Sequence, residues 1–298
     1  EVSRLGGLVI YLYFWIIYFL DFTQDSLFLN LLISSIPFVL ISFKEDMFHN
    51  TTPKNRLIAM VISCLIFFYI NPIYFPVIEI PYIGKIISLY PISIIFFTFS
   101  ILVVMNGMNF IDGMNGLCGF TSSVILIVLI FLSNTYYDDQ TIKLSYMYLA
   151  PMLIFLIFNF PFGKLFFGDM GAYFYGYLIS ILIINFFGRH ENLLSWMAVL
   201  ILFYPCMELL FSFIRKIKSN TNPFNPDNRH LHSIIFQNFL KYKYSKEKAN
   251  FFSTLALLFF WIYPVSIKFI VLDDIYSILG LLFIAFISYL IFYKYFKP

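Results

Sequence analysis

Charged residues are scarce in this sequence. Only 12% of its 298 residues are Asp, Glu, Lys or Arg, whereas soluble domains carry about a quarter. Hydrophobic residues make up 61% of the chain, and the mean hydropathy is +0.85. This composition excludes a water-soluble domain, so we expect an integral membrane protein.

Cysteine is also sparse, and the net charge is small. Cys64, Cys118 and Cys206 lie far apart, without the CxxC or Cys/His spacing of a disulfide framework or a zinc site. The formal net charge of +3 is too small to indicate a nucleic-acid partner. The first residues lack an initiator Met and a signal-peptide pattern, so we expect a truncated or processed N-terminus.

Long apolar runs dominate the rest of the sequence. A helix that crosses a bilayer needs about 20 apolar residues, and ten runs approach that length. They lie near residues 7–20, 27–43, 57–75, 88–105, 119–133, 144–160, 171–187, 193–213, 251–268 and 276–293. The sequence therefore predicts about ten transmembrane helices.

Basic residues set the expected orientation, because Lys and Arg concentrate in cytoplasmic loops. With the N-terminus inside, 15 of the 19 basic residues fall on the cytoplasmic side. The same choice places four polar stretches there: residues 45–56, 106–117, 163–171 and 223–232. The basic loop 214–250 is expected to lie against anionic lipid headgroups.

The stretch 106–117 carries Asn106, Asn109, Asp112 and Asn115 at intervals of three residues. On a helix these side chains would follow one side and face a common cavity. Carboxylate and amide oxygens are the ligands that Mg²⁺ prefers, together with substrate phosphates. The alternative is that these small and polar residues hold neighbouring helices together.

Glu45 and Asp46 are adjacent at the end of a predicted span. Two adjacent carboxylates repel each other, which raises the pKa of one unless a cation offsets it. Lys54 and Arg56 follow before the next span, so this stretch suits a metal-phosphate site or a proton acceptor. An ordinary polar loop with balanced charge is the alternative.

Asp169 lies between two glycines where another span begins, with Lys164 just upstream. A turn in which Asp169 caps the following helix is the ordinary interpretation. Its place on the same side as the other acids favours a functional one, because an acid at that depth is costly.

His230 and His232 follow Arg229 and lie two residues apart. On a helix their rings would point to different sides, and only a more extended stretch would let both face one ligand. They suit phosphate binding better than zinc, for which no third ligand has a clear spacing. Glu208, in or at the end of a span, is expected to face the interior or to pair with a base such as Arg215.

Together these stretches resemble the polyprenyl-phosphate N-acetylhexosamine-1-phosphate transferases of glycosyltransferase family 4, which include the undecaprenyl-phosphate GlcNAc-1-phosphate transferases and the phospho-MurNAc-pentapeptide translocases. The resemblance covers nearly the whole chain. In order, the motifs that carry it are Arg4-Leu-Gly6-Gly7, Glu45-Asp46, Asn106-x-x-Asn109-x-x-Asp112-Gly-x-Asn115-Gly-Leu, Phe167-Gly-Asp169-x-Gly and Pro226-Asp-x-x-His230-Leu-His232.

The resemblance implies an all-α polytopic membrane protein with a cytoplasmic-face active site in the inner (plasma) membrane. Residues 1–298 would form a single transferase domain that lacks the family's first helix. The implied partners are a UDP-N-acetylhexosamine, undecaprenyl phosphate and membrane lipids, and such enzymes are often homodimers. The Glu-Asp pair is similar to that of O-antigen-initiating members.

In the implied reaction, the lipid phosphate attacks the sugar-proximal phosphorus and UMP leaves. The resemblance gives Asn109 and Asp169 the role of holding Mg²⁺, or alternatively Mn²⁺, on the diphosphate, and places Asn115 near the uridine. It implies catalytic roles for Glu45, Asp46 and Asp112, with Glu45 and Asp46 positioning or deprotonating the lipid phosphate. It implies substrate contacts for Lys54, Arg56, Asn106, Asn115, Lys164, Arg229, His230 and His232.

Several positions depart from the family pattern. Asn115 stands where a second acid is common, Ser233 stands in the histidine run, and Glu208 stands where Asp is common. These departures concern the choice of sugar more than the reaction. An ion-coupled transporter or lipid carrier is the alternative function, but it predicts inverted repeats and polar groups near the bilayer midplane.

Overall fold

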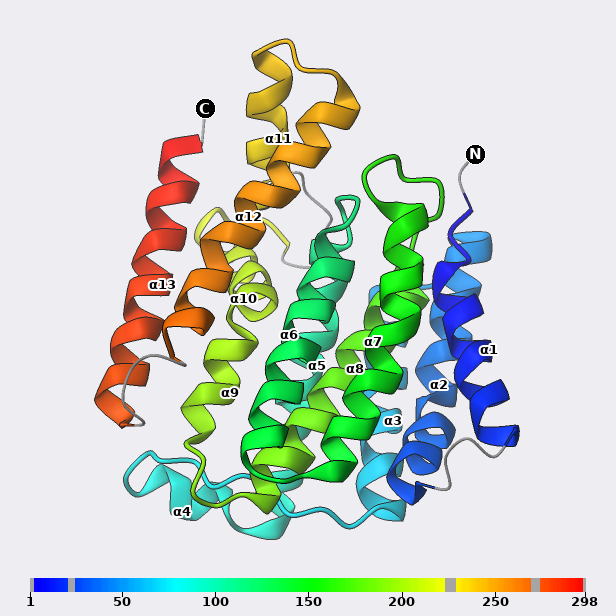
Figure 1. Ribbon diagram of the computed structural model, residues 1–298, viewed down its shortest axis with the longest axis vertical. Helices are drawn as coiled ribbons and strands as arrows, with labels where there is room; N and C mark the ends of the chain where they lie inside the picture. The colour runs from blue at the N-terminus through cyan, green and yellow to red at the C-terminus, as the bar shows by residue number, and fades with distance from the viewer. Residues whose placement is uncertain (1–2, 21–24, 223–228, 269–273, 297–298) are drawn as a thin grey trace.

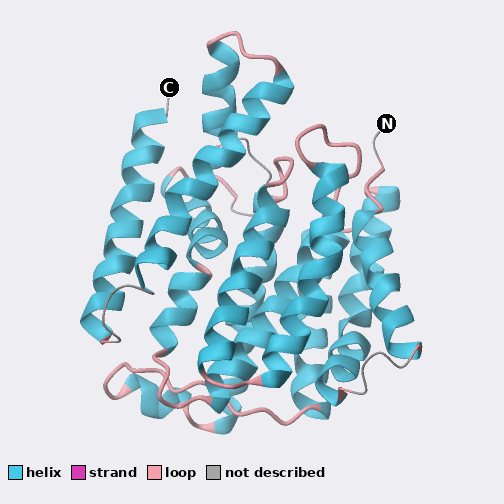
Figure 2. Cartoon of the chain, in the orientation of Figure 1, coloured by secondary structure: helices cyan, strands magenta, loops and turns pink. Residues whose placement is uncertain are grey.

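Helices make up the regular structure. Thirteen α-helices and no strand occur in residues 3–20, 25–222, 229–268 and 274–296, the part of the chain that the computed structural model describes (Figures 1 and 2). They are α1 (Gly6–Phe19), α2 (Ser26–Phe48), α3 (Pro53–Ile70), α4 (Ile83–Ile87), α5 (Tyr90–Ile111), α6 (Leu117–Thr135), α7 (Asp139–Asn159), α8 (Gly168–Arg189), α9 (Ser195–Ile201), α10 (Phe203–Lys218), α11 (Leu231–Lys241), α12 (Lys246–Lys268) and α13 (Ile275–Phe296). The expected all-α polytopic fold is confirmed.

Eight of the helices in the described residues are long and apolar enough to cross a membrane, namely α2, α3, α5, α6, α7, α8, α12 and α13. The pair α9 and α10 would make a ninth span, although the two helices are bent by 77° relative to each other. The apolar helix α1 is shorter, with 14 residues. Each of the ten apolar runs thus falls on a helix or on this bent pair.

The run 193–213 is not one straight span, which corrects the expectation from the sequence. Pro205 lies in the first turn of α10, where its missing N–H is tolerated, but it could not continue a ladder from α9. The loop expected at 214–250 is also partly helical, because α10 runs on to Lys218 and α11 lies within it. Helix α11 has only 11 residues, too few to cross a membrane.

Capping residues set where several helices begin. Thr52 accepts a 3.2 Å hydrogen bond from the backbone N–H of Asn55, and Pro53 occupies the first position of α3. Asp138 caps α7 in the same way, by accepting a 3.0 Å bond from Thr141. Helix α8 has no side-chain cap from its own N-terminal residue, so its first amides need partners from elsewhere in the fold.

Helix α8 lies at the centre of the bundle, and nearly all of its residues are buried. It packs against α1, α2, α5 and α6. Its tyrosines satisfy their hydroxyls inside the protein: Tyr177 bonds to Ser34 at 2.8 Å and to the Ser63 carbonyl at 3.2 Å. Lipid offers no hydrogen-bond partners, so these contacts hold α8 to its neighbours.

Close packing of α1 on α8 depends on Gly7. A Cβ at this position would overlap the backbone nitrogen and Cα of Gly171. The backbone amides of Gly6 and Gly7 also donate to the carbonyls of Phe166 and Phe167, at 3.1 and 2.9 Å. The double glycine of the first motif therefore serves as a contact surface for the start of α8.

The polar stretches 45–56, 106–117 and 163–171 gather at one end of the bundle, the upper end in Figure 1, together with residues 229–232, the part of the fourth stretch that the structure describes. There α2 ends and α3 begins, α5 ends and α6 begins, and α7 ends and α8 begins (Figure 1). The hairpin of α11 and α12 projects at the same end. Residues from distant parts of the sequence are thereby brought to one surface.

Candidate active site

Asp169, in the first turn of α8, lies at the centre of the polar cluster. Its Oδ2 forms an ion pair with Nη1 of Arg56 from α3. Its Oδ1 accepts a 2.9 Å hydrogen bond from Nδ2 of Asn109 on α5. The Tyr173 hydroxyl, one turn along α8, donates to Oδ1 of Asn109 at 3.3 Å. Three of the predicted site residues thus meet around one carboxylate.

Asp46 supplies the missing cap of α8. Its Oδ1 accepts from the backbone N–H of Asp169 at 2.8 Å, and its Oδ2 accepts from that of Met170 at 2.9 Å. A negative charge is stabilised at a helix N-terminus by the free amides and the helix dipole. Gly168 has a φ of +78° and lies so close that a Cβ would overlap this carboxylate.

The two acids of the pair face different partners. Glu45 accepts from the backbone N–H of Thr51 at 2.8 Å and from its hydroxyl at 2.6 Å, both in the loop between α2 and α3. Asp46 faces α8 instead. Consecutive residues on a helix point in directions about 100° apart, so adjacency in sequence does not make them a joint site.

Asp112 is the residue that directly follows α5. The backbone amide of Gly168 is hydrogen-bonded to its carboxylate. Burial raises the pKa of Asp112 well above its ordinary value, and the nearby carboxylates of Asp169 and Asp46 raise it further. Three acids from α2, from the end of α5 and from α8 are therefore close enough to influence one another.

The donor set fits a magnesium ion shared with a substrate. No three Asp, Glu, His or Cys side chains among the described residues are grouped to enclose a metal ion by themselves. Mg²⁺ does not need such a cage, because it usually takes one or two protein carboxylates together with water and substrate phosphates. Asp169 and Asn109 supply adjacent oxygen-bearing groups of that kind.

The histidine motif lies under the loop that follows α5. The rings of His230 and His232 are parallel, 5.5 Å apart between centroids with 6° between their planes. His230 packs edge-on against Phe110 at 4.8 Å, and Nε2 of His232 lies where a Cβ on Gly113 would touch it. Pro226 and Asp227 of the same motif lie outside the described residues.

Glu208, from α10, lies close to both histidines. Its Oε2 is 3.4 Å from Nδ1 of His230, and its Oε1 is 4.0 Å from Nδ1 of His232. Sequence reasoning anticipated a buried, paired acid here, but it named Arg215 as an example and gave Glu208 no part in the site. His230 has extended backbone angles and directly precedes α11, which agrees with the extended alternative that allows both rings to face one group.

Burial lowers the pKa of His232 to about 4, against the opposing effect of the Glu208 carboxylate and with a smaller lowering by His230. The His232 side chain is 3% exposed and that of His230 is 11% exposed. His230 is thus the more accessible member of the pair.

Asn115 does not continue the face of α5, which corrects the expectation of one helical row. Helix α5 ends at Ile111, and Gly116 has a φ of +81° that interrupts the helix. Asn115 is instead tied to α12: its N–H donates to Oδ1 of Asn250 at 3.1 Å, and its carbonyl accepts from Thr254 at 2.9 Å.

The other predicted substrate contacts lie at the same end. Lys54, Lys164 and Arg229 are exposed. Asn106 lies one turn before Asn109, and its amide donates to the Leu102 carbonyl at 2.8 Å within α5. Their roles in binding stay predictions.

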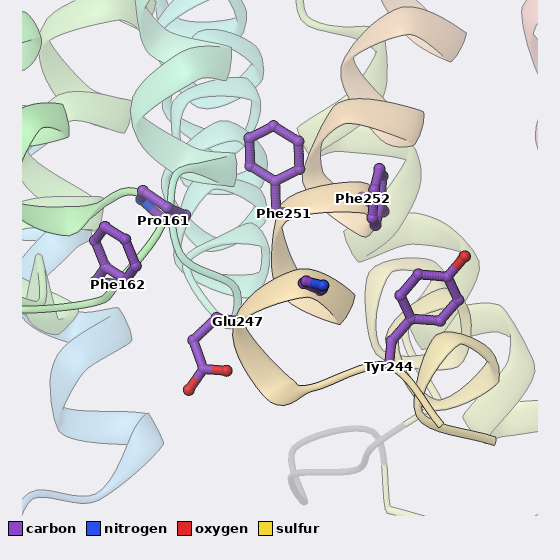
Figure 3. A pocket seen from close by; sticks show the side chains of 7 residues that line it. Pro161, Phe162, Tyr244, Glu247, Phe251 and Phe252 are labelled. Atoms are coloured by element: carbon purple, nitrogen blue, oxygen red, sulfur yellow. The ribbon is translucent and has the colours of Figure 1, made fainter. Parts of the chain in front are cut away.

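An aromatic cavity opens beside Asn115, and sequence reasoning missed it. It has a volume of about 320 Å³ (Figure 3). It lies between the loop after α7 and the start of α12, and it is lined by Pro161, Phe162, Tyr244, Glu247, Lys248, Phe251 and Phe252. The Asn115 side chain donates to the Pro161 carbonyl at 3.3 Å, which connects this cavity to the polar cluster.

The fold and this cluster define a multi-pass membrane protein with a polar site at the end of its helix bundle. Its family is shown by sequence comparison. The model of glycosyl transferase family 4 matches residues 28–187, more than half of the chain, and the protein belongs to this family. The match contains the acidic pair, the stretch 106–117 and Asp169.

Individual relatives are more distant. An undecaprenyl-phosphate alpha-N-acetylglucosaminyl 1-phosphate transferase of Thermotoga maritima is 26% identical over 242 residues, which cover 81% of this chain and 70% of that protein. A probable undecaprenyl-phosphate N-acetylglucosaminyl 1-phosphate transferase of Bacillus subtilis is 31% identical over 144 residues, 48% of this chain and 39% of that protein. A decaprenyl-phosphate N-acetylglucosaminephosphotransferase of Mycobacterium leprae is 28% identical over 154 residues, which cover 45% of this chain and 39% of that protein.

Proposed function

We propose that this protein transfers an N-acetylhexosamine-1-phosphate from a UDP-sugar to a polyprenyl phosphate, with undecaprenyl phosphate as the expected acceptor. An oxygen of the lipid phosphate attacks the sugar-proximal phosphorus, and the bond from this phosphorus to the oxygen of the UMP phosphate breaks. The products are polyprenyl-diphosphate-sugar and UMP. The names of the relatives support this reaction class. The observation that carries the proposal is the meeting of Arg56, Asn109 and Asp169 at one end of a membrane bundle.

Phosphoryl transfer depends on positioning and on neutralising charge, with little covalent chemistry from the protein. Arg56 is paired with Asp169 and His230 lies beside Glu208, so both are assigned to the phosphate oxygens. Burial raises the pKa of Asp112, which favours a proton on this carboxylate, so Asp112 is assigned to proton exchange with the lipid phosphate. Asp46 acts through α8, because both of its oxygens are bonded to backbone amides.

Mg²⁺ is proposed as the cofactor, with Asp169 and Asn109 as its protein ligands and Mn²⁺ as an alternative ion. When bound, the ion would neutralise charge on the diphosphate. Arg56 lies on the other oxygen of Asp169, so it holds that carboxylate in place on the side away from Asn109.

The setting of the reaction follows from the distribution of basic residues. We place the site on the cytoplasmic side of the inner membrane, where a nucleotide sugar is available, and we assign the product to the start of a cell-envelope polysaccharide such as O-antigen. A homodimer is the proposed assembly.

The direct test is release of UMP from purified protein in detergent or lipid, with Mg²⁺, undecaprenyl phosphate and a panel of UDP-N-acetylsugars. Release that requires the lipid phosphate would support the transferase and identify its sugar. No release with any donor, from protein that elutes as a folded species, would overturn the proposal. Ion or lipid flux in vesicles would then test the transporter alternative.

A further inference from the structure

Buried carboxylates in a membrane protein need a reason, because an uncompensated charge there is costly. Glu208 is 1% exposed and lies inside the protein on α10. The Tyr204 hydroxyl donates a 3.4 Å hydrogen bond to its Oε1, and the two histidines lie beside its oxygens. Every one of these groups can donate a hydrogen bond, so the pocket is built around this carboxylate.

Both imidazoles turn the same ring atom towards Glu208. Nδ1 of His230 and Nδ1 of His232 lie 3.4 and 4.0 Å from its two oxygens, and the rings are parallel. Nε2 lies on the far side of each ring, and in His232 this atom lies beside Gly113 of the polar stretch. The orientation of the rings therefore directs Nε2 of His230 out of the buried pocket.

We propose that Glu208 is a positioning residue that accepts from Nδ1–H of His230, so that the doubly protonated ring donates its Nε2–H to a phosphate oxygen of the substrate. A histidine bound through one nitrogen has its tautomer and orientation set by the partner of the other nitrogen. His230 is the more exposed of the two rings, at 11% against 3% for His232, so it is the ring that can reach a substrate. This inference rests on the proposed transferase function and adds a residue to that site.

The first test observes the protonation of His230 directly. The sequence has only four histidines, His49, His190, His230 and His232, so ¹⁵N-histidine labelling gives a simple spectrum that His230→Gln would assign. The proposal expects Nδ1 of His230 to carry a proton in the unchanged protein. A His230 ring protonated only on Nε2 would overturn it.

The second test is a double-mutant cycle on lipid-dependent UMP release. Glu208→Gln keeps the shape of the side chain and removes its charge, and we expect kcat/KM to fall roughly 10- to 100-fold, as for other residues that orient a ligating histidine. Glu208→Asp should restore part of that loss. In a His230→Gln background, the Glu208→Gln change should cost little more, because the two residues act as a unit.

Glu191→Gln is the matched control, since Glu191 is an exposed acid at the opposite end of the bundle. Additive losses in the double variant, or full kcat/KM in folded Glu208→Gln protein, would overturn the positioning role. These outcomes are distinct from failure of the proposed function, in which the unchanged protein releases no UMP with any donor.

Discussion

The carboxylate of Asp46 accepts a 2.8 Å hydrogen bond from the backbone N–H of Asp169, so that one acid of the cluster caps the helix that carries another. These residues are 123 positions apart in sequence. The contact joins the end of α2 to the first turn of α8, and it fixes the backbone position of Asp169. A substitution of Asp46 should therefore lower the rate of turnover by displacing Asp169.

Replacing Asp46 should reduce both stability and turnover. Asp46→Asn removes the charge at the N-terminus of α8 and turns one amide group towards a backbone N–H. Loss of a cap costs about 1–2 kcal/mol, so Tm measured in detergent should fall. Glu45→Gln is the comparison, because its oxygen can still accept from Thr51. An equal or larger loss of Tm in Glu45→Gln would contradict the capping role.

Replacing Asp169 should abolish turnover and leave the fold intact. Asp169→Asn removes the charge that pairs with Arg56 and the carboxylate proposed for Mg²⁺, and we expect UMP release to fall by at least about 100-fold. Elution as a folded species and near-normal membrane insertion should persist, because no span is altered. Asp139→Asn, an exposed acid at the other end of the bundle, serves as control. Substantial Mg²⁺-dependent turnover in Asp169→Asn would remove Asp169 from the metal site.

The two polar stretches that contain histidine should respond differently to alanine. His230 lies against Phe110 and Glu208, whereas His49 is exposed at the end of α2. His230→Ala should impair turnover strongly, and His49→Ala should change it by less than about twofold, as surface substitutions usually do. The measurement is the rate of UMP release from each variant. Equal losses in His230→Ala and His49→Ala would mean that the phosphate contacts have been misplaced.

A methyl group added at the contact between α1 and α8 should destabilise the protein. Gly7→Ala places a methyl group into the Gly171 backbone, and forced overpacking costs about 1–3 kcal/mol. Gly280→Ala on α13 meets nothing within 4 Å and should leave Tm unchanged or raise it slightly. Thermal unfolding of both variants would test this, and a stable Gly7→Ala protein would show that α1 can shift away from α8 at little cost.

Stability should fall in mild acid because of His232. Its pKa is lowered in the folded state from 6.5 to about 4 by burial, with Glu208 and His230 as its charged neighbours. The unfolded chain therefore binds a proton that the folded chain excludes, and the free energy of unfolding decreases as pH falls from 6.5 to 4. The shift corresponds to about 3 kcal/mol. His232→Gln should flatten this part of a Tm-against-pH curve, and identical curves would contradict the assignment.

The spans and the end of the bundle that carries the site could be predicted from the sequence. Apolar length and the distribution of basic residues are properties of the chain itself, and each predicted run lies on a helix or on the bent pair. Asn109, Arg56 and Asp169 were expected on one face of the membrane, because their stretches all leave it on one side, but the ion pair of Arg56 with Asp169 was not predicted.

Partners within the site could not be predicted in the same way. Whether Asp46 faces a substrate or a backbone amide depends on the angle between α2 and α8, which leaves no trace in local sequence. The pairing of Glu208 with the histidines depends on the 77° bend that turns α10 towards them. Asn115 was placed on a helical row because its spacing fitted one, although the glycines around it end the helix.

The bonds between Asn115 and α12 use mainly the peptide backbone of Asn115. Asn250 and Thr254 reach its N–H and its carbonyl, and those atoms are present whatever side chain stands there. An acid at this position would keep the same anchorage to the C-terminal helices. The identity of this side chain is therefore separable from the attachment of the loop, so residue 115 can change without loosening the contact with α12.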